Sequence, residues 1–284
     1  MFDGFTLQMI ALPEVTLRVR HGGAGPAVLL LHGHPRTHAT WHRVAPLLSP
    51  HFTVICPDLR GYGLSSKPPD GDNHAGYSKR KMAQDCVALM KHLGHDRFAV
   101  VGHDRGSYVA MRAALDFPAA IERLMVLDSV PIAEALARCA EPFARRWWHW
   151  FFFAQPDKPE QAILADPDKW YGFTAGQMGE EAYADYHRAI HDPFTVHAML
   201  EDYRAGLAVD RYHDEEDRRN GHKIRCPTRV IWSTRDDLPI LYDDILGIWR
   251  NWALEVSGQG IDSGHHVAED NPAELARQII QFCR

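Results

Sequence analysis

Short, fully apolar runs alternate with amphipathic stretches along most of this chain. Runs of this length without a polar interruption are typical of parallel strands that helices cover on both faces. We interpret six runs as strands: 27–31, 52–56, 98–101, 124–127, 229–232 and, more weakly, 253–256. The stripes of apolar residues between them predict helices over 78–93, 108–116 and 272–282. The pattern therefore predicts an α/β fold with a mostly parallel sheet flanked by helices.

The alternation stops between about residues 131 and 222. This stretch contains several helical patterns and the aromatic run 147–153, but no convincing strand. We interpret it as a helical cap that is inserted after the sixth strand, with the sheet resuming near Lys223. The predicted organisation is a core domain formed by residues 1–131 and 223–284, and a cap (lid) domain formed by residues 132–222.

The strongest local motif is Gly102-His103-Asp104-Arg105-Gly106, which follows a predicted buried strand and precedes a predicted helix. A strand, a Gly-x-nucleophile-x-Gly turn and a helix form the nucleophile elbow of α/β-hydrolases, here with aspartate where esterases carry serine. The two glycines permit the tight turn. The alternative without a catalytic role is that Asp104 only caps the following helix. The motif nevertheless predicts an α/β-hydrolase fold with Asp104 as the nucleophile.

Two further residues follow in the chain order of an α/β-hydrolase triad. Asp128 lies where the sixth strand is predicted to end, and His265 follows the last strand. A histidine at that place acts as a general base when an acid fixes its tautomer. We favour Asp128 as the acid, and Asp236, after the seventh strand, is the alternative or shares the role. His266 is a weaker rival to His265.

An aspartate nucleophile favours a particular kind of chemistry. A carboxylate displaces a leaving group at saturated carbon, or opens a strained ring, and becomes an alkyl ester that water then hydrolyses. The oxyanion formed in that second step needs preorganised donors. We expect the backbone N–H groups of His34 and Arg105 to supply them. Ordinary ester hydrolysis is disfavoured.

Several motifs together resemble those of the fluoroacetate (haloacetate) dehalogenases. They are Gly102 to Gly106, His149-Trp150 in the cap, Ser263-Gly264-His265, and the segments 58–63 and 202–206. The resemblance covers nearly the whole chain and implies an eight-stranded sheet. It implies that Arg105 binds the substrate carboxylate, and that His149, Trp150 and a lid tyrosine donate hydrogen bonds to the departing halide.

Two positions depart from the pattern of that family. A second carboxylate-binding arginine usually stands three residues after the first, where this chain has Tyr108. The lid tyrosine is expected soon after the segment 202–206, where this chain has Ala208. Tyr212 is the nearest candidate in sequence. A single arginine and a phenol are expected to hold a carboxylate less tightly than two arginines do.

The motifs leave two other functions open. An epoxide hydrolase uses the same aspartate nucleophile but needs two lid tyrosines, for which the sequence offers Tyr171, Tyr183, Tyr186, Tyr203 and Tyr212. A ligand-binding protein without turnover also fits the fold, but the complete triad disfavours it. The leading prediction is a hydrolytic dehalogenase that acts on haloacetates or a related small 2-halo acid.

Composition excludes several partners. A net charge of −6 argues against a nucleic-acid partner. Five singly spaced cysteines suit free thiols in a reducing compartment, and no signal peptide or spanning run is apparent, so we expect a cytoplasmic protein. Zinc-type histidine or cysteine spacings and phosphate-binding loops were not found, so we predict no metal and no cofactor. The expected partners are a small-molecule halo acid and water, with a homodimer left open.

Overall fold

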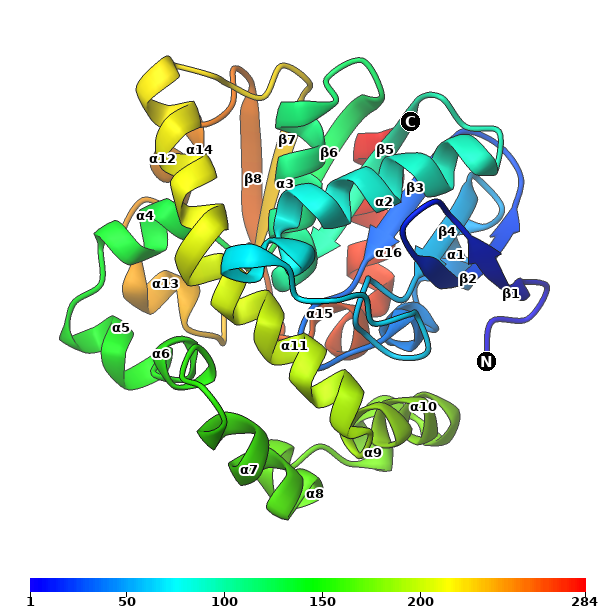
Figure 1. Cartoon of the computed structure of the whole chain (residues 1–284). Coiled ribbons are helices and arrows are strands. Elements are labelled where there is room, and N and C mark those ends of the chain that lie inside the picture. Colours follow the sequence, from blue (N-terminus) through cyan, green and yellow to red (C-terminus); the bar gives the residue numbers. More distant parts are fainter.

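The computed structural model describes residues 1–284. Its centre is one eight-stranded sheet with the order β1-β2-β4-β3-β5-β6-β7-β8 (Figure 1). The strands are β1 (Thr6–Ala11), β2 (Thr16–Gly23), β3 (Ala27–Leu31), β4 (Thr53–Pro57), β5 (Phe98–His103), β6 (Ile121–Leu127), β7 (Thr228–Ser233) and β8 (Val256–Ile261). Only the pairs that involve β2 are antiparallel. The predicted mostly parallel sheet of eight strands is confirmed.

Helices cover both faces of this sheet. On one face lie α2 (Lys79–His92), α3 (Arg105–Asp116) and α14 (Ile245–Arg250), and on the other lie α1 (Ala45–Leu48), α15 (Val267–Asp270) and α16 (Pro272–Cys283). Strand β3 shows why its sequence is apolar throughout: Leu29 and Leu31 join the first core, whereas Val28 and Leu30 join the second. Both faces of such a strand are shielded from water, so neither face tolerates polar residues.

The segment between β6 and β7 is entirely helical and covers the carboxyl ends of the strands (Figure 1). Its helices are α4 (Ile132–Ala137), α5 (Glu141–Arg146), α6 (His149–Phe153), α7 (Lys158–Ala165), α8 (Pro167–Tyr171), α9 (Ala175–Met178), α10 (Glu180–Ile190), α11 (Pro193–Ala205) and α12 (Arg211–Asn220). A π-helical turn, Gly206–Asp210, joins α11 to α12. The predicted helical cap after the sixth strand is confirmed, while the exact domain boundaries remain a prediction.

The last strand differs from its prediction. We expected it at 253–256, but β8 spans Val256–Ile261, and Ala253 forms only an isolated bridge with Ile224. The strand lies at the sheet edge and has no apolar run, so its pattern is weak. A Cβ on Gly258 would lie 2.2 Å from the Val230 carbonyl oxygen, so glycine permits the close approach to β7. Helix α3 also begins earlier than predicted, at Arg105.

No helix of the chain combines the length and the apolar character needed to cross a membrane.

Candidate active site

Asp104 projects from a strained turn at the carboxyl end of β5. Its backbone has φ 51° and ψ −120°, outside the regions that non-glycine residues prefer. The turn requires the two flanking glycines, because a Cβ on Gly102 would lie 2.3 Å from the Gly106 carbonyl oxygen and one on Gly106 would lie 2.5 Å from that of His32. Strain of this kind persists where the surrounding structure enforces it, commonly at functional sites.

Backbone N–H groups contact the Asp104 carboxylate. Oδ1 accepts a hydrogen bond from the His34 backbone N–H at 2.7 Å, and the Arg105 backbone N–H also bonds to the carboxylate. Glycine is needed at Gly33, where a Cβ would lie 2.2 Å from this oxygen. Burial favours the neutral acid, but His265 and these donors together hold the pKa of Asp104 well below its usual range. Asp104 is therefore an ionised carboxylate.

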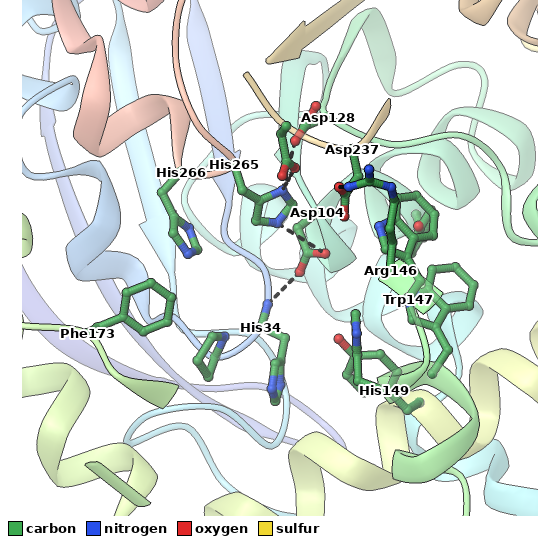
Figure 2. A pocket seen from close by; sticks show the side chains of 15 residues that line it. His34, Asp104, Asp128, Arg146, Trp147, His149, Phe173, Asp237, His265 and His266 are labelled. Carbon is green, nitrogen blue, oxygen red and sulfur yellow. Dashed lines mark hydrogen bonds and ion pairs between the residues drawn. The ribbon is translucent and has the colours of Figure 1, made fainter. Parts of the chain in front are cut away.

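His265 lies between Asp104 and two further carboxylates (Figure 2). Its Nε2 is 3.7 Å from Asp104 Oδ2, and its Nδ1 is 2.8 Å from Asp128 Oδ2 and 2.9 Å from Asp236 Oδ2. Burial alone lowers the pKa of a histidine, but the nearby Asp104 carboxylate and the hydrogen bonds to Asp128 and Asp236 raise that of His265 well above its usual value.

The two candidate acids contact the same nitrogen from different environments. Asp128 is completely buried at its side chain, has φ 55°, and accepts a hydrogen bond from the Ser233 backbone N–H at 3.0 Å. Burial raises its pKa to about 6 despite the opposing effect of His265. Asp236 keeps 26% of its side chain exposed, and its pKa is lowered, because the contact with His265 outweighs its partial burial. The structure thus brings both carboxylates into position to orient His265.

A cavity of about 210 Å³ separates this group from the cap. The core contributes the lining residues His34, Pro35, Asp104, Tyr108, Asp128, Asp236, Asp237, His265 and His266. The cap contributes Arg146, Trp147, His149, Trp150, Phe173 and Tyr203. Figure 2 shows His149 and Trp147 across the cavity from His265. A cavity of this size accommodates only a small molecule.

His149 and Trp150, which the sequence predicted as substrate contacts, both line the cavity. Burial lowers the pKa of His149 to about 4, so its ring is neutral at neutral pH and offers one N–H donor. Trp150 is held by aromatic neighbours: Trp147 stacks on it at 5.4 Å between centroids, and Tyr108 meets it edge-on at 6.1 Å. These neighbours fix the indole in the cap.

The Arg105 side chain does not line the cavity. It is buried, and its guanidinium donates to the Asp202 carboxylate at 3.1 and 3.2 Å and to the Asp202 carbonyl oxygen at 2.7 Å. The guanidinium also lies 4.1 Å from the ring centroid of Tyr203, which does line the cavity. The side chain that was expected to bind the substrate carboxylate is therefore already paired with an internal one.

Tyr212 is not part of the site either. It lies on α12 with 63% of its surface exposed and is absent from the cavity wall. The lid tyrosine that reaches the cavity is Tyr203, from α11. Of the other tyrosines considered, Tyr171 packs near His34, at 5.5 Å between ring centroids, without lining the cavity. Sequence spacing alone did not reveal which face of α11 and α12 turns toward the core.

Arg146 is a cavity residue that sequence reasoning missed. It is the only arginine or lysine on the cavity wall, and its Nη1 donates to Asp237 Oδ1 at 2.6 Å (Figure 2). The pair joins α5 of the cap to the loop after β7. The signal in the sequence was the pair Arg145-Arg146 directly before the aromatic run, but nothing in that pattern distinguishes a cavity arginine from a solvated one.

Comparisons with known proteins show the family and the fold of the chain. Residues 26–165 match the model of the alpha/beta hydrolase fold family. The chain is 38% identical to a fluoroacetate dehalogenase from Burkholderia sp over 99% of this chain and 95% of the relative. It is 32% identical to a soluble epoxide hydrolase from Corynebacterium sp., over 92% of this chain and 91% of the relative. The crystal structure of a putative alpha/beta hydrolase from Nostoc sp superposes with a TM-score of 0.96 at 41% identity, covering 99% of both chains.

Proposed function

Because the chain belongs to the fluoroacetate dehalogenase family of α/β-hydrolases, we propose that it hydrolyses the carbon–halogen bond of a small 2-halo acid. The observation that carries the proposal is the Asp104 carboxylate: Oδ1 accepts from the His34 N–H, and Oδ2 faces His265 at 3.7 Å. Such a carboxylate is an oriented nucleophile with a base beside it.

In the first step, Asp104 Oδ2 attacks the carbon that bears the halogen. A carbon–oxygen bond forms, the carbon–halogen bond breaks, and halide leaves with the bonding electron pair. The product is an alkyl ester on Asp104. Oδ1, which already accepts a hydrogen bond from the His34 backbone N–H, keeps the carboxylate in the orientation for attack.

In the second step, water attacks the carboxyl carbon of Asp104 while His265 Nε2 accepts its proton. Negative charge develops on Oδ1, where the backbone N–H groups of His34 and Arg105 stabilise it. Collapse of this intermediate breaks the ester bond, the departing alkoxide takes the proton from His265 and leaves as a 2-hydroxy acid, and the Asp104 carboxyl group then loses its proton to solvent. Asp128 and Asp236, at 2.8 and 2.9 Å from Nδ1, stabilise the imidazolium that forms.

The cap supports halide departure. His149 is neutral because burial lowers its pKa to about 4, and it lies across the cavity from Asp104 together with Trp150. N–H donors in a small cavity stabilise a departing halide more strongly than water does. A carbon–fluorine bond demands such donors most, because fluoride is a poor leaving group.

We assign recognition of the substrate carboxylate to Arg146. Arg105 is paired with Asp202, and Tyr108 replaces the second arginine of the family pattern. Arg146 is the cation that the cavity wall offers, and 40% of its side chain remains exposed, so a substrate carboxylate can compete with Asp237 for it. Two parallel hydrogen bonds from a guanidinium suit a carboxylate.

The test is a product panel. The purified chain is incubated separately with fluoroacetate, chloroacetate and styrene oxide, and free halide and diol are measured, with Asp104→Ala as the inactive control. Halide release without diol supports the proposal. Diol without halide contradicts the proposal and indicates an epoxide hydrolase. Absence of both products contradicts hydrolysis through Asp104 for these substrates.

Epoxide hydrolysis is the second candidate. It is favoured by two phenols on the cavity wall, Tyr203 from the cap and Tyr108 from α3, and by the 32% identical epoxide hydrolase. A phenol O–H can protonate the oxygen of an opening ring. Because only one of these phenols comes from the cap, the pair differs from the two lid tyrosines that ring opening was expected to need.

A further inference from the structure

Three side chains of the cap face one another away from the cavity. His187 and His191 stand one helical turn apart, at the carboxyl end of α10, and Asp168 comes from α8. Asp168 Oδ2 lies 3.4 Å from Nε2 of each histidine. All three side chains are partly exposed, and no lysine or arginine pairs with Asp168.

The spacing of these atoms suits a shared metal ion better than hydrogen bonds. A charge-assisted N–H···O bond is usually about 2.7–2.9 Å long. Zinc holds histidine nitrogen and carboxylate oxygen at about 2.0–2.2 Å in a tetrahedron, so two such ligand atoms lie about 3.3 Å apart. The two distances from Asp168 Oδ2 to the histidine nitrogens, both 3.4 Å, match that tetrahedral edge, and all three ligand atoms lie within 4.8 Å of one another.

The tautomer of His191 also favours metal binding. Its Nδ1 is 2.8 Å from the His187 carbonyl oxygen, which can only accept, so Nδ1 carries the proton. The lone pair of the neutral ring is then on Nε2, the atom that faces Asp168. Histidines that bind metals commonly donate their other N–H to a carbonyl or carboxylate in this way.

We propose that Asp168, His187 and His191 form a binding site for one divalent transition-metal ion of the zinc class, with water completing the coordination. Two imidazoles and one carboxylate favour zinc, nickel or copper over magnesium or calcium, which prefer oxygen ligands. The site is separate from the proposed catalytic residues and does not depend on the proposed reaction. It also revises our sequence prediction of no metal, which passed over the His-x-x-x-His spacing on one helix.

A metal ion here would join α8 to α10 and brace one wall of the cavity. Tyr171, the last residue of α8, packs near His34, at 5.5 Å between ring centroids, and Phe173, two residues further, lines the cavity. Tyr186 of α10 packs against Phe173 at 5.9 Å. The expected effect of metal binding is therefore a more stable cap.

A second group of histidine and carboxylates serves as the matched control. His197 on α11 lies 3.1 Å from Glu160 and 3.3 Å from Asp70. Arg204 already pairs with Glu160 in this group, at 2.8 Å. Because a permanent cation occupies this group, it should not bind zinc, and His197→Ala removes a histidine without touching the proposed site.

The test is calorimetric titration of zinc chloride into the tag-free, chelator-treated full chain at pH 7.5. We expect one site per chain with micromolar affinity. His187→Ala and His191→Ala should each weaken binding at least about tenfold, and Asp168→Asn should weaken it less, whereas His197→Ala should leave it unchanged. Zinc should raise the thermal midpoint of the wild type and of His197→Ala only.

Two outcomes would overturn the proposal. One is that the wild type binds no zinc below millimolar concentration. The other is that the double variant His187→Ala, His191→Ala retains the wild-type affinity, as it would if zinc bound at the His265 group or near His197. Circular dichroism of each variant establishes that these exposed substitutions leave the fold intact.

Discussion

The two walls of the cavity are built in different ways. The core wall consists of residues at the carboxyl ends of strands: Asp104 after β5, Asp128 after β6, Asp236 after β7 and His265 after β8. The cap wall consists of residues on short helices, among them Arg146, His149 and Tyr203. Parallel strands that share one sheet must bring their ends together, whereas the packing of short helices leaves many arrangements open.

This contrast assigns the two walls different tasks. In the proposed mechanism, the core wall supplies the nucleophile, the base and the oxyanion donors, which any reaction through an aspartyl ester needs. We propose that the cap wall supplies the contacts that distinguish a halo acid from an epoxide. Substitution of Asp104 or His265 should therefore abolish turnover of every substrate, and substitutions in the cap wall should change the ranking of substrates.

The largest effect is expected at the acids behind His265. Asp128→Asn should lower kcat by about 10³–10⁴-fold, because Asp128 is buried and fixed by the Ser233 N–H, so an amide there misorients the ring. Asp236→Asn should lower kcat by about tenfold or less, because Asp236 is partly exposed. Steady-state kinetics of both variants measure the difference. Equal losses would contradict a leading role for Asp128.

The pH dependence of kcat tests how the acids behind His265 affect its pKa. His265 acts as a base only when neutral, and the neighbouring carboxylates raise its pKa, so kcat should fall as pH falls through that pKa. Asp236→Asn removes one negative charge, lowers the pKa of His265, and should move the acidic limb of the kcat profile to lower pH. Asp237→Asn is the control, because Asp237 does not contact His265. If the acidic limb of the kcat profile does not shift in Asp236→Asn, Asp236 does not raise the pKa of His265.

A smaller effect is expected from the cap tyrosines. Tyr203→Phe should lower kcat by about 10²-fold if the phenol donates to the leaving atom, whereas Tyr212→Phe should change it less than about twofold. Each substitution removes one phenol hydroxyl group. That of Tyr203 is on the cavity wall, and that of Tyr212 is on the exposed surface of α12. Halide release by the two variants checks this. If Tyr212→Phe lowers kcat more than Tyr203→Phe does, Tyr203 is not the tyrosine that donates to the leaving atom.

The smallest effect is expected at Arg146. Arg146→Gln should raise KM for chloroacetate by about tenfold, because a partly exposed guanidinium contributes a modest charged hydrogen bond. It should leave KM for the neutral analogue chloroacetamide nearly unchanged. Asp237→Asn, which frees Arg146 from its partner, should lower KM for chloroacetate. An equal change for both substrates would contradict a role in carboxylate recognition.

The apolar runs predicted strands β3 to β7 and the residues at their carboxyl ends, but they did not predict the antiparallel strands β1 and β2. Apolar runs are diagnostic where strands are buried on both faces, as in β3 and β5, and residues that follow such runs must meet at one edge. The family resemblance added the eight-stranded fold, which is confirmed. The pattern was weakest at β8, an edge strand with Gly258 and Gly260 in place of an apolar run.

The sequence was not sufficient for the cap wall. Whether Arg105 faces a substrate depends on Asp202, nearly a hundred residues later, which pairs with it only after α11 packs on the core. Whether Tyr203 or Tyr212 reaches the cavity depends on how the π-helical turn at Gly206–Asp210 rotates α12 relative to α11. Local periodicity contains neither of these facts, because both arise from tertiary packing.

The central claim is tested most directly by weighing the enzyme during turnover. His265→Asn retains the nucleophile but lacks the base that activates water, so the ester on Asp104 should accumulate after chloroacetate is added. Intact-protein mass spectrometry should then find one added carboxymethyl group, and peptide mapping should locate it on Asp104. A variant that releases one equivalent of chloride while its mass stays unchanged would contradict covalent catalysis by Asp104.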